Sequence, residues 1–139
     1  MPEGGRYEKL PRPESIDYFI SGVLSHHKVI DVKRIDDQLF RITKTNNREI
    51  LTHLTNIYVV SQAEVFEIMA QHELKIDAII TISSWNSYSE SGKEIAKEND
   101  IALFIMNEFM GALNFDGKQF INYLTPSQRE ELEKKKRTL

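Results

Sequence analysis

Hydrophobic and polar positions repeat with two different periods along this chain, and the changes of period divide it into segments. Five apolar residues fall at helical spacing and predict a first helix over about residues 14–26: Ile16, Phe19, Ile20, Val23 and Leu24. Residues 1–13 carry three prolines and two glycines, which predicts an irregular arm ahead of this helix.

The next segments alternate with the period of β-strands. Residues 28–34 and 38–44 predict two short strands, with Asp36-Asp37 as the turn between them. Asn46-Asn47 then predicts a second tight turn, because asparagine tolerates the left-handed backbone conformation. Residues 48–60 are rich in β-branched side chains and predict the third strand of an antiparallel meander.

The helical period returns after Ser61, which forms a capping-box pattern with Glu64. The rest of the chain predicts buried strands over 76–82 and 101–106, helices over 89–99 and 107–113, and a charged helix from Thr125 to the end. The later strand–helix–strand unit should have parallel strands and a right-handed crossover. We therefore predict an α/β fold with a mixed central sheet, an antiparallel meander at its front and helices on both faces.

The pattern favours an arm over 1–13, a single α/β domain over 14–124 and a charged C-terminal helix over 125–139. The chain has 139 residues, a formal charge of -3 and no cysteine. The lack of cysteine excludes a disulfide framework, a zinc ribbon, an iron–sulfur cluster and a Cys nucleophile. There is no apolar run of the roughly 20 residues that span a bilayer, and the first 15 residues show no apolar signal region. We expect a cytoplasmic protein with no membrane partner.

The element order and the stretch from Val60 to Phe109 resemble Mrr-like members of the restriction-endonuclease-like PD-(D/E)xK superfamily. The matching pieces are Val60-Ser61, residues 79–84, 93–97 and 101–109. In element order, the resemblance covers residues 14–113. It implies a nuclease fold and a role with nucleic acid in DNA metabolism or defence.

The resemblance also implies a catalytic acid-x-Lys triplet on the third strand, where carboxylates would hold Mg²⁺. No Asp, Glu or Lys lies between Ile50 and Glu64, and Asp31-Val32-Lys33 has the required residue types on the first strand instead. We therefore expect a member without catalysis and without a metal or other cofactor. The alternative is a Mg²⁺-dependent nuclease that uses relocated carboxylates, for which the candidates are Asp31, Asp36, Asp37 and Glu49.

Two regions are candidates for nucleic-acid contact. The meander carries a basic cluster of Lys33, Arg34, Arg41, Lys44 and Arg48. The loop over 83–89 carries Trp85 and Tyr88, which could stack on bases, and polar residues that could bind an anion beside a helix N-terminus: Ser83, Ser84, Asn86 and Ser89. The alternative is that the two aromatic side chains cover the edge of the core. The ligand hypothesis requires Trp85 to be partly exposed and to lie near the helix N-terminus.

The remaining charged features have simpler interpretations. The four histidines lack the spacing of a metal site, and His26-His27 suits the end of a helix. The terminal run EELEKKKR suits a solvated helix, with a basic contact to nucleic acid as the alternative. The partner we expect is nucleic acid or a protein associated with it, and a homodimer is compatible with a domain of this size.

Overall fold

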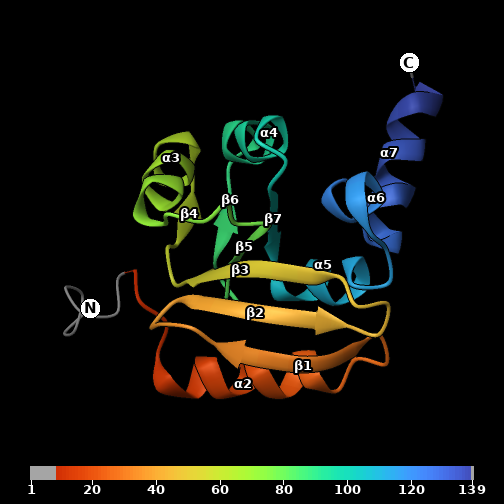
Figure 1. Ribbon diagram of the computed structural model, residues 1–139. Helices are drawn as coiled ribbons and strands as arrows, with labels where there is room; N and C mark the ends of the chain where they lie inside the picture. The colour runs from red at the N-terminus through yellow and green to blue at the C-terminus, as the bar shows by residue number, and fades with distance from the viewer. Residues whose placement is uncertain (1–8, 139) are drawn as a thin grey trace.

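A mixed five-stranded sheet forms the centre of the computed structural model, which describes residues 9–138 (Figure 1). Its strands lie side by side in the order β1 (Val29–Arg34), β2 (Leu39–Lys44), β3 (Glu49–Thr55), β5 (Ala78–Thr81) and β7 (Ala102–Ile105). β1, β2 and β3 are antiparallel, whereas β3, β5 and β7 are parallel. The predicted α/β class, the mixed sheet and the meander are confirmed.

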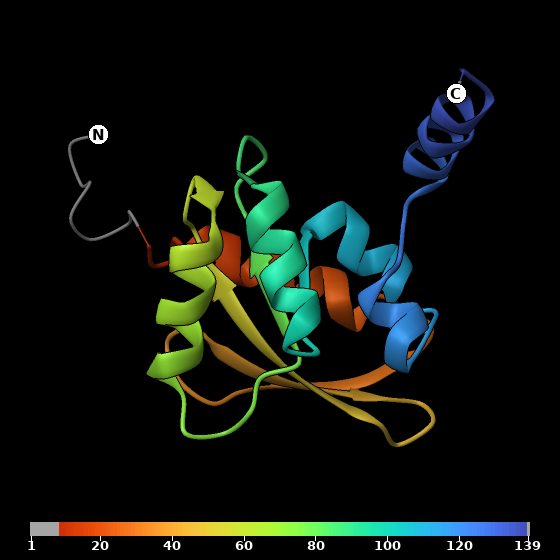
Figure 2. The same cartoon turned by 90° about the horizontal axis from the view of Figure 1, so that it is seen from above.

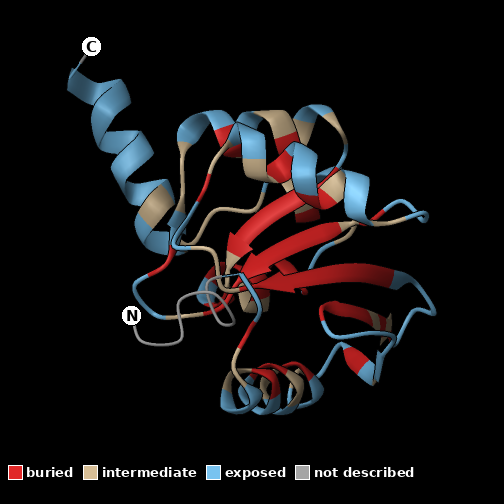
Figure 3. Cartoon of the chain, turned by 90° about the vertical axis from the view of Figure 1, so that its left-hand side faces the viewer, coloured by how far each residue is buried: buried red, intermediate tan, exposed pale blue. Residues whose placement is uncertain are grey.

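Helices cover both faces of this sheet (Figure 2). α2 (Pro13–Leu24) and α5 (Met106–Ala112) pack on one face, and α3 (Gln62–Gln71) and α4 (Glu90–Glu98) pack on the other. Neighbouring strand residues serve opposite cores, since Ile80 and Phe104 face α2 while Ile79 and Leu103 face α3. β5 is therefore buried along its whole length, as its apolar sequence predicts (Figure 3).

The third strand is shorter than the predicted segment 48–60. β3 ends at Thr55, which pairs with Thr81, the last residue of β5. Beyond that point the large sheet has no neighbouring strand on this side, so the chain turns away. It forms β4 (Val59–Val60), which pairs in parallel with β6 (Ser87–Tyr88) in a separate small sheet. This departure from the sheet leaves space at the end of β3.

Local capping signals in the sequence correspond to the observed helix starts. Glu64 accepts hydrogen bonds from the backbone N–H of Ser61, at 2.9 Å, and from its hydroxyl group. Ser89 caps α4, because its Oγ accepts a hydrogen bond of 3.0 Å from the Gly92 N–H. Pro13 occupies the first turn of α2, and Asn47 has a φ of 68° in the second meander turn.

Two further helices follow α5. α6 (Gly117–Ile121) was not predicted, and it places Phe120 against Phe104 and Phe109 in the core. α7 (Pro126–Thr138) confirms the predicted charged helix; it has no buried residue and projects from the rest of the chain (Figures 1 and 2). Between residues 9 and 138, no helix has the length and apolar character needed to cross a membrane. The expected arm falls outside the described residues over 1–8.

Candidate functional site

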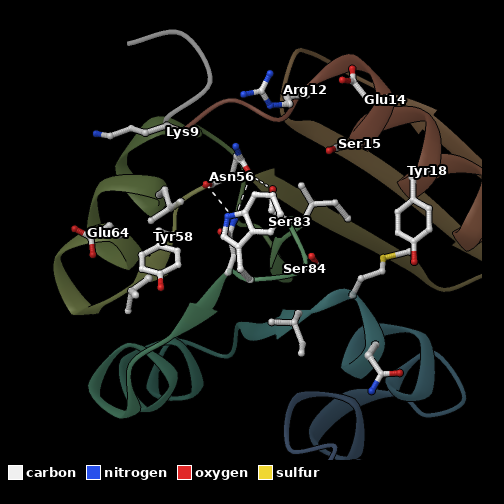
Figure 4. Close-up of a pocket in the computed structure, with 18 residues that line it drawn as sticks. Lys9, Arg12, Glu14, Ser15, Tyr18, Asn56, Tyr58, Glu64, Ser83 and Ser84 are labelled. Atoms are coloured by element: carbon white, nitrogen blue, oxygen red, sulfur yellow. Dashed lines mark hydrogen bonds between the residues drawn. The ribbon is translucent and has the colours of Figure 1, made fainter. Parts of the chain in front are cut away.

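A cleft of about 1420 Å³ opens at the carboxyl ends of the parallel strands (Figure 4). The start of α2 forms one side, and the segments after β3, β5 and β7 form the rest. Ligands commonly bind at the carboxyl ends of parallel strands, because the loops there can vary without disturbing the sheet. Its lining includes basic, aromatic and small polar side chains, among them Lys9, Arg12, Tyr18, Tyr58, Trp85 and Asn86.

Three exposed aromatic side chains surround this cleft. The exposed fraction is 62% for Tyr18, 65% for Tyr58 and 70% for Trp85. Tyr18 and Tyr58 come from α2 and from the segment after β3, and they lie on opposite sides of the cleft (Figure 4). Exposed rings that gather around one cleft, unlike rings scattered singly over a surface, are typical of a site that contacts a partner. The partial exposure of Trp85 required by the ligand hypothesis is confirmed.

The charged groups of the cleft have mixed signs. Lys9 and Arg12 lie along its upper edge in Figure 4, and the Lys9 Nζ is 2.5 Å from Oε1 of Glu67. Glu14 and Glu64 also line the cleft, and hydrogen bonds from Ser61 lower the pKa of Glu64. Lys9 and Arg12 therefore border one edge together with Glu14, and Glu64 lies at α3 (Figure 4).

A network of small polar side chains forms the floor. Asn86 is 5% exposed, and its Nδ2 donates to Oγ1 of Thr81 at 3.0 Å and to two oxygens of Asn56 at 3.1 Å. The Ser83 hydroxyl also donates to Oδ1 of Asn56 (Figure 4). These bonds tie the loop after β5 to the segment after β3 and hold the loop in one conformation.

In the structure, only part of the predicted ligand loop lines the cleft. Ser83, Ser84, Trp85 and Asn86 line the cleft together. Ser89 instead caps α4, so its oxygen serves the helix itself rather than an anion. Tyr88 is partly buried, and its hydroxyl donates to Oε2 of Glu108 at 2.6 Å.

Tyr88 belongs to a second polar cluster that sequence reasoning missed. Glu108 is 2% exposed and also accepts a hydrogen bond of 2.6 Å from Nε2 of Gln128. Lys93 donates to the Leu103 carbonyl at 2.5 Å, and burial lowers the pKa of Lys93 to about 8. Burial and the Glu108 carboxylate raise the pKa of Tyr88. The Glu108 hydrogen bonds join β6, α5 and α7, and Lys93 ties α4 to β7.

The five basic residues of the meander do not form one patch. Lys33 and Arg41 are cross-strand partners on one face, and Arg41 also lies 4.0 Å from Glu49. Arg34 is on the other face, where its guanidinium lies 5.9 Å from the centre of the Phe40 ring. Arg48 lies in the turn before β3 and is exposed.

Lys44 corrects the expectation of a surface contact. It is 2% exposed, and its Nζ donates to Oδ1 of Asp116 and to the Phe115 carbonyl, both at 2.8 Å. The ammonium group lowers the pKa of Asp116. Lys44 therefore ties β2 to the segment before α6, and a phosphate group would have to compete with that ion pair.

The four carboxylates considered for a relocated metal site do not come together at one point. Asp36 accepts from the N–H groups of Gln38 and Leu39 at 2.8 and 2.7 Å, as a turn cap does, and Asp37 lies 3.8 Å from Arg34. Asp31 lies on the exposed part of edge strand β1, and Glu49 faces Arg41. Within residues 9–138, no group of three or more His, Asp or Glu side chains is placed to hold a metal ion.

β3 carries neutral side chains at the place where the resemblance would put the triplet. His53 and Thr55 project from the same face of the strand, since they are two residues apart. His53 is 1% exposed, and its ring hydrogen-bonds to His72 at the end of α3. Sequence spacing gave no sign of this pair, because the two histidines are 19 positions apart.

Comparison with known proteins adds no assignment to this geometry. No family model, no curated protein and no solved structure matches the chain.

Proposed function

We propose that this chain is a non-catalytic restriction-endonuclease-like domain that binds unpaired nucleic acid in the cleft at the end of β3. The observation that carries the proposal is the placement of Tyr18, Tyr58 and Trp85, all largely exposed, around a single cleft. Unpaired bases stack on such rings, and each base contributes about 1–3 kcal/mol to binding.

The charge distribution supports the same ligand. Lys9 and Arg12 lie at one edge of the cleft, where a phosphate backbone would compete with Glu67 for the Lys9 ammonium while bases reach inward. The chain as a whole has a net charge of -3, so the basic contact would be local. A ligand with apolar faces and a separate anionic strand fits this division better than a free anion does.

The absence of catalysis is part of the proposal. After Glu49 at its start, β3 carries no carboxylate and no lysine, and the four alternative carboxylates are engaged in turns or with arginines or lie at the exposed edge. Mg²⁺ needs several oxygen ligands at one point to stabilise the charge on a reacting phosphate. Binding without cleavage is the function that this set of side chains supports best.

The test is fluorescence anisotropy with a labelled single-stranded oligonucleotide and the full chain at low and moderate salt. We expect binding that weakens as salt rises. Trp85→Ala should weaken binding by about 5- to 150-fold, the equivalent of one stacked base. Phe66→Ala is the matched control, because Phe66 is 46% exposed on α3 and is not among the residues that line the cleft.

Two outcomes would contradict the proposal. One is the absence of binding at low salt, where contacts to phosphates are strongest. The other is equal loss of binding in Trp85→Ala and Phe66→Ala, which would show that the cleft has no special part. Cleavage of the oligonucleotide in Mg²⁺ that disappears in Asp31→Ala or Glu49→Ala would instead support a nuclease.

A further inference from the structure

At the floor of the cleft, the surroundings of the Asn86 side chain fix which of its amide atoms donates and which accepts. Asn86 is more than nine-tenths buried, and its Nδ2 is held by Oγ1 of Thr81 and by two oxygens of Asn56. The Thr81 hydroxyl donates its own hydrogen to the Ile57 carbonyl at 2.6 Å, so Oγ1 is left to accept. The nitrogen and oxygen of the Asn86 amide are therefore assigned by their surroundings.

The consequence is an unpaired acceptor at the floor. No residue between 9 and 138 donates a hydrogen bond to Oδ1 of Asn86, although the Asn86 side chain lines the cleft. In that same part of the chain, no side-chain nitrogen or oxygen sealed from solvent lacks a partner. Because this oxygen is not sealed from solvent and Asn86 lines the cleft, it can accept a hydrogen bond from a ligand there.

Ser83 adds a second acceptor beside it. Its hydroxyl hydrogen points to Oδ1 of Asn56, so the lone pairs of Oγ are what it can offer to a ligand. Glu14 and Glu64 line the same cleft. Acceptors at the floor disfavour a phosphate there and favour a group that carries N–H donors.

We infer that the cleft reads the amino group of a nucleobase, with Oδ1 of Asn86 and Oγ of Ser83 as its acceptors. This inference rests on the proposed function and names the ligand class of the same site. Cytosine, adenine and guanine carry an exocyclic amino group, whereas thymine and uracil have a carbonyl oxygen at the position of the cytosine amino group. The sugar–phosphate strand then runs past Lys9 and Arg12, and the base reaches inward beside the rings.

The experiment compares oligo(dC) with oligo(dT) of the same length and with an oligonucleotide of N4,N4-dimethylcytosine. These ligands share strand charge and ring size, but only oligo(dC) has an amino donor. We expect oligo(dC) to bind the full chain roughly tenfold more tightly than the other two, since one well-made contact to a base edge contributes about 1–3 kcal/mol.

The protein side of the contact is tested with Asn86→Ala, which should bind oligo(dC) and oligo(dT) equally. Asn114→Ala is the control and should keep the preference, because Asn114 is exposed after the C-terminal end of α5 and is not among the residues that line the cleft. If Asn86→Ala does not fold, the comparison of the three oligonucleotides with the native chain still decides the matter.

The outcomes separate this inference from the proposed function. Equal binding of the three oligonucleotides, tighter binding of oligo(dT), or a preference that a folded Asn86→Ala variant keeps overturns the reading of an amino group and leaves the proposed function standing. Failure of every oligonucleotide to bind overturns both.

Discussion

Nδ1 of His53 and Nε2 of His72 lie 2.7 Å apart and share a hydrogen bond between β3 and the end of α3. On the other side of the His53 ring, Nε2 of Gln38 is 3.3 Å from Nε2 of His53. The Gln38 nitrogen carries two hydrogens and also lies 3.1 Å from the Leu54 carbonyl and 3.4 Å from the Lys9 carbonyl, and within the histidine pair one ring donates to the other. Two neutral rings can form this hydrogen bond, because each has one N–H donor and one acceptor nitrogen.

This pair predicts that acid destabilises the fold. Burial, and then the neighbouring His72, lower the pKa of His53 from 6.5 to about 3, and burial also lowers the pKa of His72. Below pH 6.5 the unfolded chain therefore takes up protons that the folded chain refuses. For His53 alone, the free energy of unfolding should fall by about 2 kcal/mol between pH 7 and pH 5.

Urea denaturation at the two pH values measures this effect. His53→Gln should reduce the difference between pH 7 and pH 5, whereas Phe66→Ala, which removes an exposed side chain of α3 that does not titrate, should leave it unchanged. Equal unfolding free energies at both pH values in the native chain would show that the pair is not held neutral.

Asp116→Ala should destabilise the chain by about 3 kcal/mol, because it leaves the buried ammonium of Lys44 without its carboxylate partner. Asp37→Ala is the matched control, since the Asp37 side chain is 90% exposed and its ion pair with Arg34 is weak. Denaturation midpoints compare the two variants. A loss of less than 0.5 kcal/mol in Asp116→Ala, on the order of a surface substitution, would be inconsistent with a structural role for Lys44.

Gly92→Ala should destabilise the packing of α4 on β4. An added Cβ would lie 2.5 Å from the Val60 carbonyl oxygen and 3.1 Å from two backbone atoms of Ser61, none of which can move freely. We expect a loss of about 1–3 kcal/mol, as for other overpacked sites. Glu94→Ala, an exposed position of the same helix, should change the thermal midpoint little. A stabilised Gly92→Ala variant would argue against this close approach.

Lys93 predicts a rise in stability at alkaline pH. Its pKa in the folded chain is about 8 because of burial, so between about pH 8 and 10 the unfolded chain holds a proton that the folded chain has lost. The free energy of unfolding should therefore increase with pH in that range. Lys93→Met should abolish the increase, whereas Lys118→Met, at an exposed position of α6, should retain it. A native chain that loses stability over this range would contradict the prediction.

Most of what could be predicted of the fold came from patterns among residues that are close in sequence. The pairs Ser61–Glu64 and Ser89–Gly92 lie within three residues of each other, so the sequence itself places these helix starts. The predicted end of the third strand was wrong, because the observed end depends on the length of β5, a strand more than 20 residues later. α6 was missed because its five residues are too few for a helical period to be recognised.

The candidate site depended more on contacts between distant segments. Trp85 could be identified as a single exposed aromatic residue, but its grouping with Tyr18 and Tyr58 comes from three separate elements. Lys44 looked like a surface residue because its partner Asp116 is 72 positions away. Charge and spacing within one segment cannot show such pairings.

The central claim is tested most directly by the fluorescence of Trp85, the only tryptophan in the chain, during titration with a single-stranded oligonucleotide. The account predicts saturable quenching of this fluorescence, with the same midpoint as binding measured by anisotropy, because a base stacks on the indole. Binding by anisotropy with no change in Trp85 fluorescence would contradict the account, since the nucleic acid would then bind away from the cleft.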